Sequence, residues 1–134
     1  MEHDVSSKNP VTILVVDDDQ EILNLHSAFL TAKGYKVFCC KGGETAIRKL
    51  DEISPQLAII DILMFGLDGA TTLRKVREKL GSDFPVIICS STNLKVSSLD
   101  NPRHTRYVRK PIDFDKVESE INSLLNPESP EEIL

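Results

Sequence analysis

The chain has 134 residues, of which 40% are hydrophobic and 28% are charged, and these values are typical of a single soluble globular domain. Its formal net charge of −5 excludes the excess of positive charge with which proteins bind nucleic acid nonspecifically. No apolar stretch approaches the roughly 20 residues that cross a bilayer. We therefore expect a cytoplasmic protein that binds neither nucleic acid nor membranes directly.

Five short apolar runs predict β-strands, and amphipathic patterns lie between most of them. The runs cover residues 11–16, 37–40, 57–60, 86–89 and 107–108. Apolar residues at helical spacing predict helices over residues 20–33, 44–53, 69–80 and 113–125. The alternation predicts an α/β fold, in which a doubly wound five-stranded parallel sheet with the strand order 2-1-3-4-5 has helices on both faces.

Composition divides the chain into three parts. Residues 1–10 are polar and contain no signal-peptide core, so they are predicted to form an N-terminal extension. Residues 11–125 hold all the periodic segments and form the one predicted domain. Residues 126–134 contain two prolines and three glutamates, which favours a disordered acidic tail.

Residues 92–104 are the weakest part of the predicted domain. They contain three apolar residues, which are too few for the core-facing stripe of a full helix. Pro102 also disfavours helical backbone at Asn101. We predict at most two helical turns between residues 93 and 99, followed by an extended lead into the fifth strand.

Polar side chains follow the apolar runs, and the second run is followed only by Lys41 and two glycines. Asp17 and Asp18 follow the first run, Asp61 the third, Ser90 the fourth and Lys110 the fifth. Ligands of open α/β sheets bind beyond the carboxyl ends of the strands, so these side chains are predicted to form one site. Clustered carboxylates hold either protons or a cation, and oxygen ligands at a semi-open site suit Mg²⁺. Carboxylate, metal, lysine and hydroxyl groups together favour phosphoryl transfer.

Some of the nearby acids have a structural interpretation instead. Asp19 is predicted to cap a helix, because no other strand end requires it, and Asp68 is predicted to do the same before Gly69. Asp18 and Glu21 also fit a capping box. A cap uses one carboxylate rather than a pair, so we favour the site for Asp18.

Four motifs in this order resemble the receiver domains of two-component response regulators, over about residues 12–125. They are the acidic pair Asp17-Asp18, the loop from Asp61 to Gly69, the strand that ends in Ser90, and Tyr107-Val-Arg-Lys110-Pro111. The resemblance implies a flavodoxin-like fold, like that of the single-domain chemotaxis regulators. It also implies a phosphorylation-activated signalling switch, which catalyses its own phosphotransfer and slow dephosphorylation but is not an enzyme with a separate substrate.

The resemblance implies how the phosphoryl group would be handled. Asp61 would accept it from the phosphohistidine of a sensor histidine kinase or from a phosphotransfer protein. Lys110 and Ser90 would bind the phosphoryl group, and a shift of Ser90 would let Tyr107 turn inward. The changed conformation would control an unidentified downstream protein or output domain.

The resemblance also implies a metal site. Asp18 would bind Mg²⁺ directly, with Mn²⁺ as a possible substitute, and Asp17 would bind through water. Asp61 and the backbone carbonyl of Leu63 would be further ligands. Phe65 stands where the family usually has proline, and Ser91 stands where it usually has alanine.

Two other functions stay open. A haloacid-dehalogenase-type phosphohydrolase could use Asp17-Asp18-Asp19 as its Asp-x-Asp motif, but no threonine follows in that loop and no cap domain is visible. A pseudo-receiver would dock partners without being phosphorylated. The intact set of Asp18, Asp61 and Lys110 argues against this second alternative.

Overall fold

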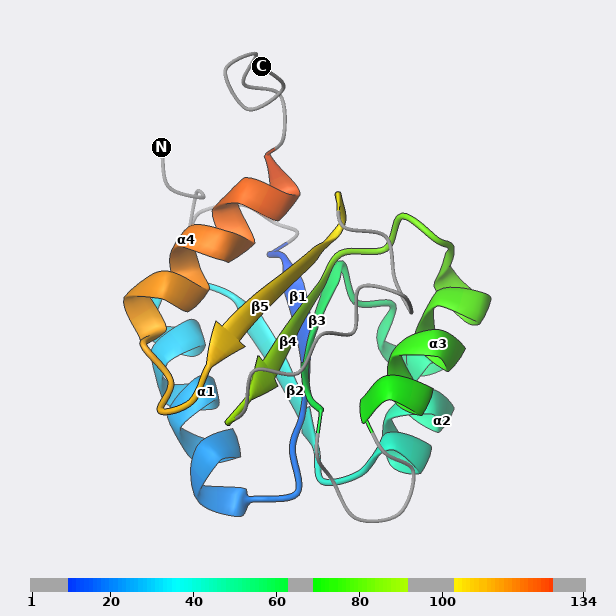
Figure 1. Cartoon of the computed structure of the whole chain (residues 1–134), viewed down its shortest axis with the longest axis horizontal. Helices are drawn as coiled ribbons and strands as arrows, with labels where there is room; N and C mark the ends of the chain where they lie inside the picture. The colour runs from blue at the N-terminus through cyan, green and yellow to red at the C-terminus, as the bar shows by residue number, and fades with distance from the viewer. Residues whose placement is uncertain (1–9, 63–68, 92–102, 127–134) are drawn as a thin grey trace.

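The computed structural model describes residues 10–62, 69–91 and 103–126. Its strands form one parallel sheet in the order β2-β1-β3-β4-β5, which confirms the predicted topology (Figure 1). The strands are β1 (Thr12–Val16), β2 (Lys36–Cys40), β3 (Leu57–Asp61), β4 (Val86–Ser90) and β5 (Thr105–Arg109). The helices are α1 (Gln20–Ala32), α2 (Gly43–Ile53), α3 (Gly69–Leu80) and α4 (Phe114–Leu125).

Helices cover both faces of the sheet, α1 and α4 on one side and α2 and α3 on the other (Figure 1). The alternation of side chains along β1 shows how one strand serves two cores. Leu14 and Val16 pack with residues of α2 and α3, whereas Ile13 and Val15 pack with residues of α1 and α4. Burial on both faces explains why β1, β3 and β4 are continuously apolar in the sequence.

Residues suited to helix ends flank α1 on both sides. Asp19 is the N-cap, and its side chain accepts a hydrogen bond of 2.9 Å from the backbone N–H of Glu21, as predicted. Gly34 follows the helix with a φ of 97°, a conformation that glycine adopts without steric cost.

Several predictions fall outside the described residues. These are the N-terminal extension up to residue 9, the cap at Asp68, the short helix in the 92–104 segment, and the tail from residue 127.

All three cysteines are free, with Cys40 and Cys89 buried and Cys39 exposed on the edge strand β2. Among the described residues, no helix combines the length and the apolar composition needed to cross a membrane.

A buried histidine lies between α1 and α4. His26 is 1% exposed, and its ring meets the Phe114 ring edge to face, with 5.1 Å between the centroids. Its Nδ1 atom has no hydrogen-bond partner within the described parts of the chain. Burial, and secondly the charge of Lys110, lowers the pKa of His26 from 6.5 to about 4.

We expect this histidine to make the fold sensitive to acid. The unfolded chain binds a proton at His26 below pH 6.5, whereas the folded chain resists protonation down to about pH 4. Stability is therefore lost as the pH falls through this window, by about 3 kcal/mol at its lower end. The free energy of unfolding of the wild type and of His26→Leu is measured with urea at pH 7 and at pH 4. The stability of the wild type relative to the variant should be lower at pH 4 than at pH 7. A difference that is the same at both pH values would contradict the prediction.

Candidate functional site

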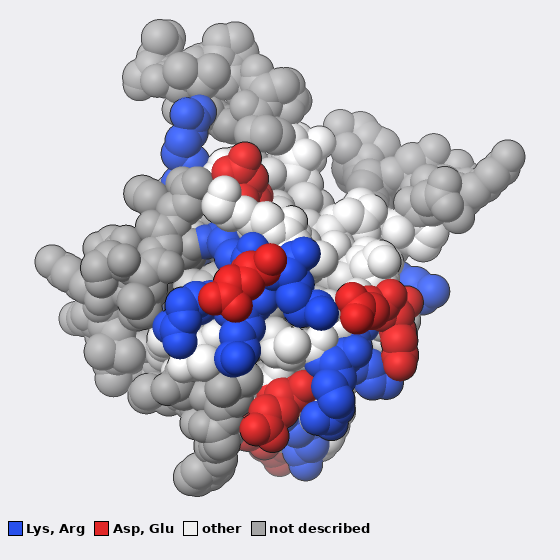
Figure 2. All heavy atoms as spheres, turned by 90° about the vertical axis from the view of Figure 1, so that its right-hand side faces the viewer, with Lys and Arg blue, Asp and Glu red and all other residues white. Residues whose placement is uncertain are grey.

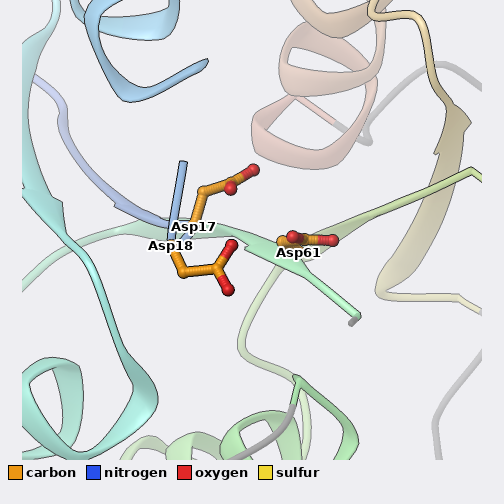
Figure 3. A group of neighbouring side chains, drawn as sticks. All are labelled: Asp17, Asp18 and Asp61. Carbon is orange, nitrogen blue, oxygen red and sulfur yellow. The ribbon is translucent and has the colours of Figure 1, made fainter. Parts of the chain in front are cut away.

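Three carboxylates meet at the carboxyl edge of the sheet. Asp17 and Asp18 directly follow β1, and Asp61 is the last residue of the neighbouring strand β3. Each offers an oxygen within 4.8 Å of the others, and in Figure 3 the side chains of Asp17 and Asp18 extend towards the side on which Asp61 lies. Asp17 and Asp61 are 2% and 5% exposed, so two of the three acids are buried.

Backbone hydrogen bonds fix Asp17 and leave one of its oxygens to the site. Its N–H donates to the Cys40 carbonyl at 3.1 Å, which extends the pairing of β1 with β2 by one residue. Its Oδ1 accepts the N–H of Asp19 at 2.9 Å. Its Oδ2 faces Lys110 instead, with 3.6 Å between the oxygen and Nζ.

Lys110 supplies the positive charge of the site. It follows β5, and its Nζ lies 3.3 Å from Asp61 Oδ2. Its backbone N–H donates to the Ser90 carbonyl at 2.8 Å, which places it beside the end of β4. Burial alone would lower the pKa of Lys110, but Asp61 and then Asp17 outweigh burial and raise it. The ammonium group therefore keeps its proton at neutral pH.

The negative charge of the site exceeds what one lysine balances. Burial raises the pKa of Asp17, and the charges of Asp61 and Asp18 raise it further, whereas the Asp19 N–H and Lys110 act in the opposite direction. Three clustered oxygen donors at a site of excess negative charge match the ligand chemistry of Mg²⁺. The residues present therefore fit a hard divalent cation.

The other predicted site residues differ in how far they are buried. Ser90 is 8% exposed at the end of β4, one residue beyond the partner of Asp61 in the strand register. Tyr107 lies on β5 and is 41% exposed, so its ring is at the surface. Ser91 is exposed. Leu63 and Phe65 lie outside the described residues.

Asp19 does not join the cluster. Its side chain caps α1, so the proposed Asp-x-Asp pair of a phosphohydrolase would have to draw its second acid from a helix cap. The structural interpretation of Asp19 is confirmed.

The comparisons with known proteins agree with this geometry. The sequence model of the family "Response regulator receiver domain" matches residues 13–122. The chain belongs to this family.

Curated relatives that match this receiver domain include longer proteins. Response regulator MprA of Mycobacterium sp. (strain KMS) is 30% identical over 126 residues, which cover 92% of this chain and 54% of that protein. Transcriptional regulatory protein ZraR of Klebsiella oxytoca is 34% identical over 122 residues, which cover 89% of this chain and 27% of that protein. The chain thus spans about half the length, or less, of these curated relatives.

Solved structures show the same fold. The chemotaxis protein CheY4 of Vibrio cholerae superposes with a TM-score of 0.79 at 19% identity, covering 87% of this chain and 99% of that one. A putative response regulator from Chloroflexus aurantiacus J-10-fl has a TM-score of 0.75 at 26% identity, covering 87% of this chain and 98% of that one. The flavodoxin-like receiver fold predicted from the sequence is confirmed.

Sequence reasoning missed the steric role of Gly69 in this receiver domain. Gly69 begins α3, and its N–H donates to the Ile62 carbonyl at 3.2 Å. A methyl group on its Cα would overlap the backbone of Asp61 and Ile62. The available signal was a glycine at the start of a predicted helix. The sequence does not indicate which backbone atoms lie close to this glycine.

We expect Asp17→Asn to stabilise the receiver domain when no metal is bound. The raised pKa means that ionised Asp17 costs the folded state free energy at neutral pH, and asparagine removes this charge while its oxygen can still accept the Asp19 N–H. The advantage of the variant should grow as the pH rises through about 3.8, where the Asp17 carboxyl group of the unfolded wild type is half ionised.

Thermal unfolding in EDTA, followed from pH 3 to pH 7, measures this effect. Saturating Mg²⁺ should reverse the ranking, because the wild type has one more carboxylate to bind it. A variant that is less stable than the wild type across the range in EDTA would show that Asp17 is already well neutralised in the folded chain.

Proposed function

We propose that this receiver domain is a phosphorylation-operated switch in which Asp61 accepts a phosphoryl group from the phosphohistidine of a sensor histidine kinase or phosphotransfer protein. The observation that supports it most is the placement of a buried carboxylate between two further acids and a lysine. Asp61 lies within 4.8 Å of Asp17 and Asp18, and within 3.3 Å of Lys110. Family membership supports the same role.

The chemistry is a displacement at phosphorus. An Asp61 carboxylate oxygen attacks phosphorus while the bond from phosphorus to the kinase imidazole nitrogen breaks, and the electron pair of that bond returns to the nitrogen. Lys110 pairs with Asp61 before the transfer and is close enough to neutralise a phosphoryl oxygen afterwards. Ser90, at the end of the adjacent strand, can donate a hydrogen bond to the same group.

The proposed metal ligands are Asp17, Asp18, Asp61 and the backbone carbonyl of Leu63. Bound Mg²⁺, or Mn²⁺ in its place, would offset the charge of the three acids and of the phosphoryl oxygens. The protein's own part is to hold the acids in one place: β1 and β3 fix two strand ends side by side, and Asp17 is oriented by the Asp19 N–H.

We propose that the signal leaves the site through Ser90 and Tyr107. A hydrogen bond from Ser90 to a charged phosphoryl oxygen is worth about 1.5–3 kcal/mol, which is enough to bias a two-state loop. Tyr107 starts from an exposed position on β5 and would turn inward in response. The target of the signal is a downstream protein or output domain in the cytoplasm. Residues 11–125 themselves bind neither nucleic acid nor a membrane.

A stoichiometric assay tests the proposal. The protein is incubated with a small phosphodonor and Mg²⁺, and its intact mass is measured; in parallel, a chromogenic phosphate ester is offered as a substrate. We expect one phosphoryl group per chain and no sustained ester turnover. Multiple turnovers would favour the phosphohydrolase, and an unchanged mass would favour a docking module that is not phosphorylated.

Metal binding is expected to depend on Asp18. Mg²⁺ at about ten times its dissociation constant should stabilise the wild type by about 1.4 kcal/mol. Asp18→Ala should abolish this gain, because it removes one of the three clustered oxygen ligands. Asp19→Ala is the matched control, since it removes the neighbouring acid from the helix cap and leaves the cluster intact. Thermal unfolding with and without Mg²⁺ measures the gain, and an undiminished gain in Asp18→Ala would overturn the ligand set.

A further inference from the structure

One arginine joins the starts of two strands at the edge of the sheet farthest from the three acids. Arg77 lies on α3, and its Nε and Nη2 donate to the Phe84 carbonyl at 3.0 and 2.7 Å. The same Nη2 donates to the His104 carbonyl at 2.9 Å and to Thr105 Oγ1 at 3.2 Å. Phe84 precedes β4, and Thr105 is the first residue of β5.

The contacts of Arg77 fix where β5 begins. The His104 carbonyl also accepts the N–H of Val86 at 3.0 Å, so it is held by α3 and by β4 at once. Thr105 is 4% exposed, which shows that this junction is packed. An arginine suits the position because its planar fork presents several donors in a fixed arrangement, whereas a lysine offers one ammonium group.

Tyr107 lies two residues beyond this junction. Side chains two apart on a strand share a face, so Tyr107 projects on the side of β5 that Thr105 and α3 occupy. Burial raises the pKa of Tyr107, and the positive charge of Arg77 acts in the opposite direction. Tyr107 and Arg77 thus lie on the same side of the sheet and interact electrostatically.

The other end of α3 touches the phosphoacceptor strand. Gly69 begins the helix directly against the carbonyl of Asp61. A single helix therefore contacts the strand end that bears Asp61 and, two turns later, the start of the strand that bears Tyr107.

We propose that Arg77 is a positioning residue of the switch, which holds the start of β5 against α3 and thereby sets the resting position of Tyr107. The proposal rests on the proposed function, because it concerns how the same switch moves. Without the Arg77 fork, phosphorylation of Asp61 still occurs, but the start of β5 is no longer held and Tyr107 responds less.

The test uses Tyr107 as its own reporter. The chain has two tyrosines and no tryptophan, so Tyr35→Phe leaves Tyr107 as the single fluorescent tyrosine. In this background, Arg77→Gln removes both the fork and the charge, and Arg77→Lys removes the fork while it keeps the charge. Arg74→Gln is the matched control, because Arg74 is an exposed arginine on the same helix. Figure 2 shows that the α2 and α3 side of the molecule carries interspersed Lys, Arg, Asp and Glu side chains, so one fewer surface charge there is a mild change.

Three quantities are measured for each variant: the phosphoryl uptake by intact mass, the change in Tyr107 fluorescence on phosphorylation, and the Tyr107 titration by ultraviolet absorbance. We expect phosphoryl uptake in all of them. The fluorescence change should fall by about twofold or more in Arg77→Gln and Arg77→Lys, and stay at the parent value in Arg74→Gln. The Tyr107 pKa should rise in Arg77→Gln and stay near the parent value in Arg77→Lys.

Full fluorescence changes in both Arg77 variants would overturn the proposal and leave Arg77 a purely structural residue. If Arg77→Gln does not fold, Thr105→Val replaces it, since this variant removes one acceptor of the fork and should reduce the fluorescence change in the same direction. An undiminished change in Thr105→Val would then count against the proposal. A parent protein that takes up no phosphoryl group would instead refute the proposed function, and the mass measurement separates the two failures.

Discussion

The Asp61→Asn variant is expected to take up no phosphoryl group from a small phosphodonor and Mg²⁺, whereas the wild type takes up one. Asparagine has nearly the shape of aspartate, but its amide is a poor nucleophile and carries no charge to hold a divalent cation. Asp61 is 5% exposed at the end of a central strand, and its Oδ2 lies 3.3 Å from Lys110. The corresponding distance from Lys110 to Asp17 is 3.6 Å, and Asp17 follows β1 instead of ending β3.

Intact mass spectrometry measures the uptake, and circular dichroism checks that the variant is folded. Asp83→Asn is a suitable control, because Asp83 is an exposed acid that precedes β4, at the opposite end of this strand from the cluster, and its carboxylate lies 3.4 Å from His104. The control should be phosphorylated like the wild type. Phosphorylation of Asp61→Asn would point to Asp17, Asp18 or a hydroxyl group as the acceptor.

Gly69→Ala is expected to destabilise the fold by about 3 kcal/mol. The new methyl group would overlap the carbonyl oxygen of Asp61 and the Cα of Ile62, and its distance to the Ile62 carbonyl carbon would be 2.9 Å. These are backbone atoms, so they cannot rotate away as the end of a side chain does. The gain in helix propensity from glycine to alanine, at most about 1 kcal/mol, does not offset the overlap.

The same substitution is expected to slow phosphorylation, because relief of the overlap moves the backbone that bears Asp61. Urea unfolding and the rate of phosphoryl uptake measure the two effects. Gly42→Ala provides the matched control, since a methyl group at Gly42 meets nothing within 4 Å. A Gly69→Ala protein as stable as the Gly42→Ala protein would show that the loop adjusts without cost.

The sequence predicted the central strands and the convergence of the three acids, because both depend on local patterns. β1, β3 and β4 are buried along almost their whole length, so they appear as unbroken apolar runs. The strand order then brings Asp17, Asp18 and Asp61 together. The edge strand β5 was predicted as residues 107–108, yet it covers Thr105–Arg109. Thr105, Arg106 and Arg109 are polar or charged, so an apolar run marks only part of the strand.

Two contacts between residues far apart in the chain could not be predicted from the sequence, because they involve residue types that are usually exposed. Arg77 bonds to Thr105, which is 28 positions away, and arginine is ordinarily read as a surface residue. His26 occupies a position that an apolar residue could fill, and its burial follows from the meeting of α1 and α4 rather than from its own polarity. Neither contact leaves a local pattern that sequence reasoning could detect.

The site of phosphorylation in the wild type tests the central claim most directly. The protein is phosphorylated with a small phosphodonor and Mg²⁺, the acyl phosphate is reduced with borohydride, and the digested peptides are sequenced by mass spectrometry. We predict that the aspartate at position 61 is converted to homoserine, and that the conversion disappears when EDTA replaces Mg²⁺. Conversion at position 17 or 18, a phosphate that stays on a serine or threonine, or equal conversion in EDTA would contradict the account.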